Sequence, residues 1–272
     1  MIHLIVQYYQ VNYTNIDDKL IQQRQDEINR CFLSNLSNPN IDKLHFLYEK
    51  IEDVNYMQFS LGISKKHPKL VLYNLGKRMN YADIFNYPNN YPQKTNDIWI
   101  YLHGDMQLIS GFEKLRTINM DSNKIYALTA HNPKKCNKQI LCNCTRQYIT
   151  PKGLYGPTFD GFIFKSPIKQ SVIDTCNHIV HCLGAENRTI AILKNNNYNV
   201  VCPNHLLMCH HIHNVQIFAG EHSMWINLKG EYKPKEFYSN IHKEQKNKKY
   251  QEKIVGGGIP FYLGCVKFVD KL

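Results

Sequence analysis

The apolar residues of this chain lie in short, strand-length runs, and helical patterns separate several of these runs. The runs at 4–6, 98–102 and 200–201 are typical, and each is far shorter than the roughly 20 residues that cross a bilayer. Strands that alternate with helices favour a mostly parallel sheet, because the helices that connect parallel strands cover both of its faces. We therefore expect an α/β fold without a membrane span, and 272 residues are enough to bury one such core.

The hydrophobic period of each segment predicts the strands and helices. Strands are expected at 3–9, 43–49, 69–75, 97–102, 124–130, 161–167 and 198–203. Helices are expected at 20–36, 81–85, 168–182 and 186–195. In this assignment the second and third strands follow each other without a helix, and residues 131–160 form a loop. A loop of that length inside a compact domain is more often functional than accidental.

The charge and the cysteines limit the kinds of partner and the compartment. Lys and Arg number 33 against 22 Asp and Glu, and the net charge of +11 favours an anionic partner: nucleic acid, a membrane surface or a phosphate-bearing substrate. Much of the excess lies in 229–253, which we interpret as a solvated helix in preference to a nucleic-acid arm. An odd count of 9 Cys favours free thiols or metal ligands over a disulfide framework, so we expect a reducing, cytoplasmic location.

Several common motifs are missing from the sequence. It contains no P-loop, GxSxG, GxGxxG or HExxH motif, which argues against the commonest nucleotide hydrolases and dehydrogenases. Cys136, Cys142 and Cys144 lie in the long loop, but their spacing differs from the paired CxxC spacing of structural zinc sites. Unpaired thiols are therefore favoured there, and a zinc clip stays an open alternative.

Two aspartates flank predicted strands. Asp105 ends the segment LHGD after the strand at 97–102, where Gly104 allows a sharp turn. A carboxylate in this position can hold a divalent cation that bridges phosphate oxygens, or it can cap the turn, and the local pattern favours neither. Asp160 stands just before the strand at 161–167, where ordinary turn chemistry is the favoured interpretation.

Two further segments carry ionisable groups in suggestive positions. Glu186 in GAENR opens a predicted helix, where the helix dipole is expected to lower its pKa and leave an ionised base for a sugar hydroxyl. Capping of the helix is the equally weighted alternative. In CHHIH, His211 and His213 share one face of a strand, where they could bind a metal or an anion, or serve as ordinary core or surface residues.

Seven segments, taken in their order along the chain, give the sequence a family resemblance. They are RQDEINRCFLSNL, NPNIDKLHFLYE, GKRMNYADIF, LHGD, FDGFIFKSP, GAENR and YNVVCP leading into HHIH. Over 2–213 the chain resembles glycosyltransferase-like proteins with the GT-A fold from bacteria, algae and large DNA viruses. The resemblance implies a GT-A-like, Rossmann-like mixed sheet that is mostly parallel, in a catalytic domain at 1–213. Residues 214–272 would form an extension packed on or flanking it.

The resemblance also implies roles for individual residues. A DxD-like turn that binds metal and the donor diphosphate would fall on His103, Gly104 and Asp105, with a late metal-linked histidine at His211 or His213. Only one carboxylate remains in this turn, which leaves dependence on Mn²⁺ or Mg²⁺ open. The acceptor base would be Glu186. The residues expected to bind the nucleotide donor are Tyr8, Tyr9, Arg78, Tyr81, Asp83 and Arg188.

The function expected from these features is transfer of a sugar from a nucleotide-diphosphate sugar, UDP-linked by preference, to a hydroxyl of a glycan or protein. If the reaction retains the anomeric configuration, Asp160 is the candidate nucleophile. A Cys/His metal-stabilised module that binds nucleic acid is the alternative from another class, and nucleic acid is the less expected partner. A GT-A fold that has lost turnover and only binds glycans is the third. The expected location is the cytoplasm, which is the host cytoplasm if the protein is viral.

Overall fold

The structure is a computed structural model. It describes residues 1–13, 16–92, 96–131, 154–155, 159–203, 206–215, 224–226, 230–234, 266–269 and 271–272. Cys136, Cys142 and Cys144 and most of 229–253 lie outside these residues, so the zinc clip and the basic helix stay predictions. None of the described helices is long and apolar enough to span a bilayer.

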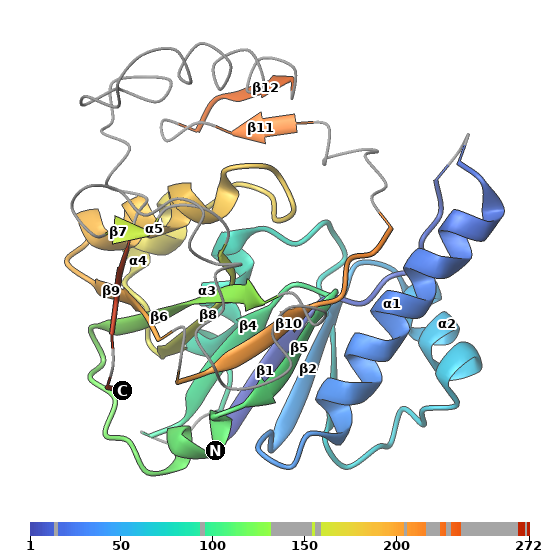
Figure 1. Cartoon of the computed structure of the whole chain (residues 1–272), viewed down its shortest axis with the longest axis horizontal. Helices are drawn as coiled ribbons and strands as arrows, with labels where there is room; N and C mark the ends of the chain where they lie inside the picture. Colours follow the sequence, from blue (N-terminus) through green and yellow to red (C-terminus); the bar gives the residue numbers. More distant parts are fainter. Residues whose placement is uncertain are drawn as a thin grey trace.

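The centre of the molecule is a mixed, mostly parallel sheet (Figure 1). Its strands lie in the order β3 (Leu70–Asn74), β2 (Lys43–Tyr48), β1 (Ile2–Val6), β4 (Ile98–Leu102), β8 (Phe159–Lys165), β6 (Lys124–His131), β9 (Asn199–Cys202), β13 (Val266–Phe268) and β7 (Leu154–Tyr155). Antiparallel pairing is confined to both sides of β8 and to the β13–β7 pair along this order. β10 (Met208–His211) branches off it, parallel to β6 and antiparallel to β5 (Met106–Ser110). A separate hairpin joins β11 (Met224–Ile226) and β12 (Tyr232–Pro234).

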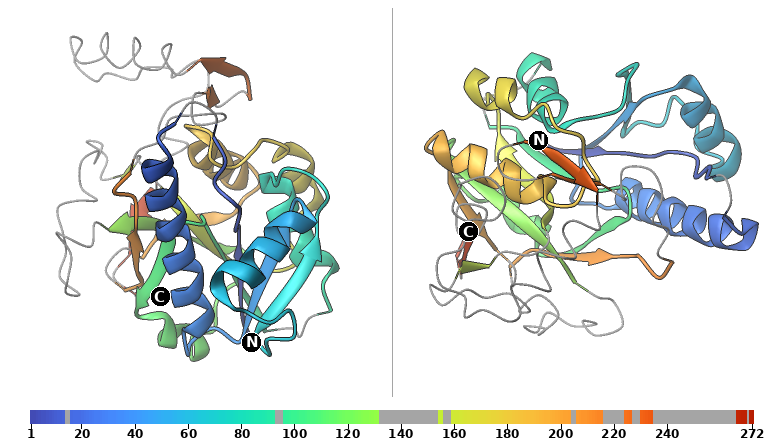
Figure 2. Two further views of the ribbon diagram at one scale, coloured as in Figure 1. Left: turned by 90° about the vertical axis from the view of Figure 1, so that its right-hand side faces the viewer. Right: turned by 90° about the horizontal axis from the view of Figure 1, so that it is seen from above.

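Helices cover both faces of this sheet. One face carries α1 (Asp18–Ser37), α2 (Ile51–Leu61) and the short 3₁₀ helix η1 (Phe112–Arg116). The other carries α3 (Tyr81–Asn90), α4 (Gln170–Thr175) and α5 (Ala185–Asn195). Figure 1 and the right view of Figure 2 show α1 and α2 grouped apart from the other three helices. The predicted fold class, α/β with helices on both faces of a mostly parallel sheet, is confirmed.

Alternation of side chains along β1 explains why both faces are apolar. Leu4 and Val6 pack with Ile28 and Phe32 of α1, whereas Ile5 packs into the second core, which contains Phe85 of α3. Strands buried on both sides need continuous apolar sequence, and β1 and β4 are buried along their whole length.

The strand directions bring separate segments to one edge of the sheet. β1, β4 and β6 run in the same direction, so their carboxyl ends lie at this edge. β10 is parallel to β6 and also ends there. β8 runs the opposite way, so its first residues lie at the same edge. The backbone amide of His103, just after β4, donates to the carbonyl of Asp160 at 3.0 Å. Residues that are far apart in sequence can therefore build one site here.

Some elements differ from the sequence-based prediction. Helix α2 connects β2 and β3, which were predicted to follow each other directly, and only Val54 and Met57 of this helix are buried, so its helical period is weak. The predicted helix at 168–182 ends at Thr175; beyond it Ile179 pairs with Asn80 and His181 has a φ of 63°. The first strand ends at Val6.

Candidate functional site

A tight turn after β4 delivers Asp105 to the edge of the sheet. The amide of Met106 donates to the carbonyl of His103 at 3.1 Å, and β5 starts at Met106. A Cβ on Gly104 would lie 2.7 Å from the carbonyl oxygen of Gln7, so only glycine lets the turn approach β1 this closely. The side chain of Asp105 is buried as a result, with 7% of the residue exposed.

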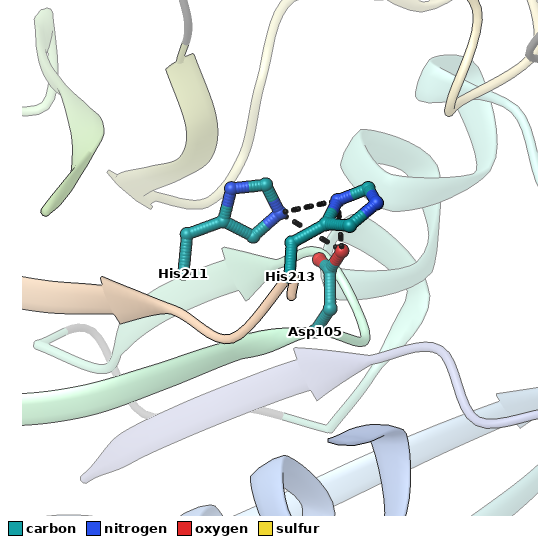
Figure 3. Close-up of side chains that lie close together, drawn as sticks. All are labelled: Asp105, His211 and His213. Carbon is teal, nitrogen blue, oxygen red and sulfur yellow. Dashed lines mark hydrogen bonds and ion pairs between the residues drawn. The ribbon is translucent and has the colours of Figure 1, made fainter. Parts of the chain in front are cut away.

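Two histidines from the end of β10 reach the same carboxylate. His211 Nε2 lies 2.9 Å from Asp105 Oδ2, and His213 Nδ1 lies 3.6 Å from the same oxygen (Figure 3). The amide of Ile212 donates to the carbonyl of Asp105 at 2.9 Å, which fixes the segment. One ligand atom from each of Asp105, His211 and His213 falls within 4.8 Å of the others, so this group, the metal cluster below, could hold a metal ion.

Neighbouring charges and burial together set the pKa values of the metal cluster. Burial alone would raise the pKa of Asp105, but His211 and Arg24 outweigh it and hold that pKa well below its usual range. Burial would lower the pKa of His211, but Asp105 outweighs it and raises the pKa to about 9. Burial and Arg24 lower the pKa of His213 to about 4.

Arg24 and Glu27 of α1 are part of this site although the sequence had suggested no role for them. Arg24 Nη2 donates to Asp105 Oδ2 at 2.6 Å, and Arg24 Nη1 donates to Glu27 Oε2 at 2.9 Å. The sequence does carry a signal, because both charges lie three residues apart on the helix face that also buries Ile28. Charged residues on an apolar face need buried partners.

A second group, the carboxyl pair, lies beside the first. It consists of Asp160 and Glu186, and the side chains of His103 and Tyr81 lie against these carboxyls. His103 Nε2 is 3.5 Å from Glu186 Oε1, and His103 Nδ1 is 3.7 Å from Asp160 Oδ1. The Tyr81 hydroxyl donates to Glu186 Oε1 at 3.4 Å. Asp160 lies inside β8, and not before the strand as predicted.

The protonation of Glu186 differs from the sequence-based prediction. The first turn of α5 was expected to lower its pKa, but burial raises the pKa to about 8 and the neighbouring Asp160 charge adds to the effect. The helix dipole is therefore the weaker influence, because two carboxyls in one buried place cannot both ionise easily. Glu186 is largely protonated at neutral pH.

Electrostatic coupling shows that the metal cluster and the carboxyl pair are neighbours. Asp160 helps to raise the pKa of His211, and Asp105 opposes the lowering by burial of the pKa of His103. Two buried carboxylate oxygens, Asp105 Oδ1 and Asp160 Oδ2, find no hydrogen-bond partner among the described residues. Such atoms are expected to meet a ligand, an ion or water.

The other predicted donor-binding residues divide between this edge and other places. Tyr9 lies at the edge, since Arg24 and Asp105 both act on its pKa, which burial raises. The ion pair between Arg78 and Glu49 is 3.8 Å long and partly exposed.

Three of these predicted residues have contacts away from the two groups. The Tyr8 hydroxyl donates to Asn29 at 2.8 Å, and its ring packs against Phe32 in the core. Asp83 completes the capping box of α3. Arg188 packs beneath Gly230, where a Cβ would lie 2.7 Å from the guanidinium.

The described cysteines bear on the expected redox state. Those with free thiols are Cys31, Cys176, Cys182, Cys202 and Cys209, and all are buried. This confirms free thiols for the cysteines that the structure describes. Cys202 and Cys209 are not members of the metal cluster.

No family model matches the sequence, and no curated protein matches it. Among solved structures, the chain is similar to 2-C-methyl-D-erythritol 4-phosphate cytidylyltransferase (IspD) from Francisella tularensis. The TM-score is 0.40 and the sequence identity 13%, over 74% of this chain and 89% of that chain.

Proposed function

We propose that this protein is a glycosyltransferase that moves a sugar from a nucleotide-diphosphate sugar, UDP-linked by preference, to a hydroxyl of a glycan or protein. The observation that carries the proposal is the meeting of three carboxyls, Asp105, Asp160 and Glu186, with imidazoles at one edge of the sheet. Ligands of open α/β sheets bind outside the carboxyl ends of the strands, which is where this edge lies. The segments that meet there also carry the resemblance to GT-A-fold proteins.

The chemistry needs a proton acceptor and positive charge. As the acceptor oxygen bonds to C1 of the sugar, the bond from C1 to the diphosphate oxygen breaks, and its electron pair leaves with the diphosphate. In an inverting reaction this is a single displacement, and Glu186 takes the acceptor proton. In a retaining reaction Asp160 is the candidate nucleophile: its carboxylate oxygen would bond to C1 as the diphosphate leaves, and the acceptor oxygen would then displace Asp160 from C1. Because the pKa of Glu186 is raised to about 8, its carboxylate form becomes abundant only at mildly alkaline pH.

The metal cluster suits a divalent cation. Asp105, His211 and His213 would hold the ion, and the orphaned Asp105 Oδ1 gives it an anionic ligand. Between the two ions expected from the sequence, two imidazole ligands favour Mn²⁺ over Mg²⁺. A bound cation would offset the negative charge that develops on the leaving diphosphate. Tyr9, Arg78, Tyr81, His103 and Gly104 are the proposed donor-binding residues nearest this edge.

A glycan-binding protein without turnover is the second candidate, because Arg24 already neutralises one oxygen of the single carboxylate in the turn. The nucleic-acid module is not favoured by any contact in the described part of the chain, whose one metal-type cluster contains no cysteine. The division into 1–213 and 214–272 remains a proposal.

The test is a screen of nucleotide diphosphates and their sugars for a rise in melting temperature, followed by transfer assays with the donors that bind. We expect UDP or a UDP-sugar to stabilise the protein, more strongly with Mn²⁺. Asp105→Asn should reduce this shift. Glu186→Gln should preserve it and abolish transfer.

The matched controls are Asp26→Asn and Glu113→Gln, which make the same chemical changes at exposed positions. Both should leave the shift and the rate unchanged. No shift with any nucleotide diphosphate would contradict the proposal, and a shift without any turnover would select the glycan-binding alternative.

A further inference from the structure

Arg24 lies at the centre of a buried network of hydrogen bonds. Its guanidinium donates to Asp105 Oδ2 at 2.6 Å, to Glu27 Oε2 at 2.9 Å and to the carbonyl of Ile212 at 3.3 Å. Glu27 in turn accepts from the amide of Asn214 at 2.7 Å and from its side chain at 3.1 Å. The Arg24–Glu27 pair therefore ties α1 both to the turn after β4 and to the segment that carries His211 and His213.

The two oxygens of Asp105 have different surroundings. Oδ2 accepts from Arg24 and lies 2.9 Å from His211 Nε2, whereas Oδ1 is buried without a hydrogen-bond partner in the described residues. His213 Nε2 is likewise buried and without such a partner. An ion held at Asp105 would therefore have Oδ1 as its free oxygen, because Arg24 keeps Oδ2.

A guanidinium in this place has an electrostatic effect on any cation bound to Asp105. Arg24 is buried, with 6% of the residue exposed, and an arginine side chain cannot lose its proton to relieve repulsion. Two positive groups on one carboxylate repel each other strongly where water is excluded. The same fixed charge attracts an anionic ligand.

We propose that Arg24 is a positioning residue that sets the charge of this site: it occupies one oxygen of Asp105 permanently, weakens the binding of a divalent cation, and supplies part of the positive charge for a donor diphosphate. The diphosphate part rests on the proposed function, whereas the effect on cation binding does not. Arg24 in this way supplies part of the positive charge that a tightly held ion would otherwise supply.

The test measures Mn²⁺ binding by the loss of the free-ion signal in electron paramagnetic resonance, without any nucleotide. Arg24→Gln removes the charge and should tighten Mn²⁺ binding by about tenfold. Arg24→Lys keeps the charge and should bind Mn²⁺ as the wild type does. Arg30→Gln, which removes the same charge from an exposed position on α1, is the control and should have no effect.

A purely structural role of Arg24 predicts the opposite sign, because a disordered site would bind Mn²⁺ more weakly. Unchanged or weaker binding by Arg24→Gln overturns the proposal, and so does tighter binding by Arg24→Lys to the same degree. Titration with UDP in the presence of EDTA forms the second arm, where Arg24→Gln should weaken binding by about tenfold. Failure of the wild type to bind UDP would count against the transferase and leave the Mn²⁺ result to decide the role of Arg24.

Discussion

Asp160 and Glu186 are two mostly covered carboxyls, and the two ring nitrogens of His103 lie 3.7 Å from Asp160 and 3.5 Å from Glu186. Burial and the Asp160 charge raise the pKa of Glu186 to about 8. A carboxyl whose pKa is raised toward neutral pH is suited to general acid–base catalysis. The raised pKa of Glu186 is therefore the feature by which the proposed catalysis at this site can be tested.

The pH dependence of transfer follows from the pKa of Glu186. The carboxylate is the form that accepts a proton, so kcat/KM should rise with pH and level off above about 8. The profile is measured with saturating Mn²⁺ and a donor found in the nucleotide screen. Glu186→Gln should remove the rising limb together with the activity, and a wild-type profile that is flat from pH 6 to 9 would exclude Glu186 as the base.

Tyr81 provides a finer test at the same scale. Its hydroxyl donates to Glu186 Oε1 at 3.4 Å, and this hydrogen bond opposes the rise in the pKa of Glu186. Tyr81→Phe removes the hydroxyl and keeps the ring in the core, so the rising limb should move to higher pH by a few tenths of a unit to about one unit. Tyr48→Phe serves as the control. A limb that moves to lower pH would show that the Tyr81 hydroxyl does not stabilise the carboxylate.

At the scale of elements, the turn between β4 and β5 is the device that positions the site. Gly104→Ala would put a Cβ 2.7 Å from the Gln7 carbonyl oxygen, so one of the two backbones must move, and the backbone of residue 104 adjoins Asp105. We expect a loss of about 1–3 kcal/mol in the free energy of unfolding and a large loss of Mn²⁺ affinity. Chemical denaturation and Mn²⁺ titration measure the two effects.

Gly62→Ala is the matched control for that substitution. Gly62 ends α2 with a φ of 63°, and a Cβ there would meet no atom within 4 Å. The change should cost roughly 1 kcal/mol of stability from backbone strain alone and should leave Mn²⁺ binding intact. Equal Mn²⁺ affinity in both alanine variants would mean that the turn does not position the metal cluster.

The elements also show which features a sequence can predict. Strands β1 and β4 were predictable because they are buried on both faces and therefore apolar throughout. Helix α2 was missed because few of its residues reach the core. Helix α4 was predicted too long because the apolar residues after Thr175 are also buried in the core, although their backbone is irregular. The spacing of apolar residues indicates which residues are buried. It indicates a helix only where the buried residues are also helical.

For the candidate site, the sequence predicted which residues lie together better than it predicted their charges. Asp105, His211 and His213 do meet, because Asp105 follows β4 and the two histidines come from the end of β10, which ends at the same edge. The partner Arg24 and the raised pKa of Glu186 depend on which helix covers that edge and on how much water it excludes. The order of the strands alone determines neither the contact with Arg24 nor the pKa of Glu186.

At the scale of the whole molecule, buried neutral histidines make folding sensitive to acid. Burial lowers the pKa of His45 and of His178 to about 3. In the unfolded chain a histidine has a pKa near 6.5. Below that pH these two histidines bind protons in the unfolded chain but stay neutral in the folded protein.

The sign of the effect is therefore fixed. The stabilising contribution of these two histidines is fully present above pH 6.5 and is lost as the pH falls toward 3. Each proton taken up only by the unfolded chain changes the free energy of unfolding by about 1.4 kcal/mol per pH unit. Glu186 acts in the opposite direction between its ordinary pKa and about 8, but with one proton against two. Stability should therefore fall on acidification below pH 6.5.

Denaturant titrations between pH 7 and 4.5 measure this slope. His178 Nε2 lies within hydrogen-bond distance of the Ala185 carbonyl and the Thr189 hydroxyl, and glutamine can replace such contacts without titrating. His178→Gln should lower the stability at neutral pH and reduce the acid slope by about one proton. If His178→Gln keeps the full slope, protonation of His178 does not drive acid unfolding, and Asp105, whose pKa is held well below its usual range, becomes the group to test next.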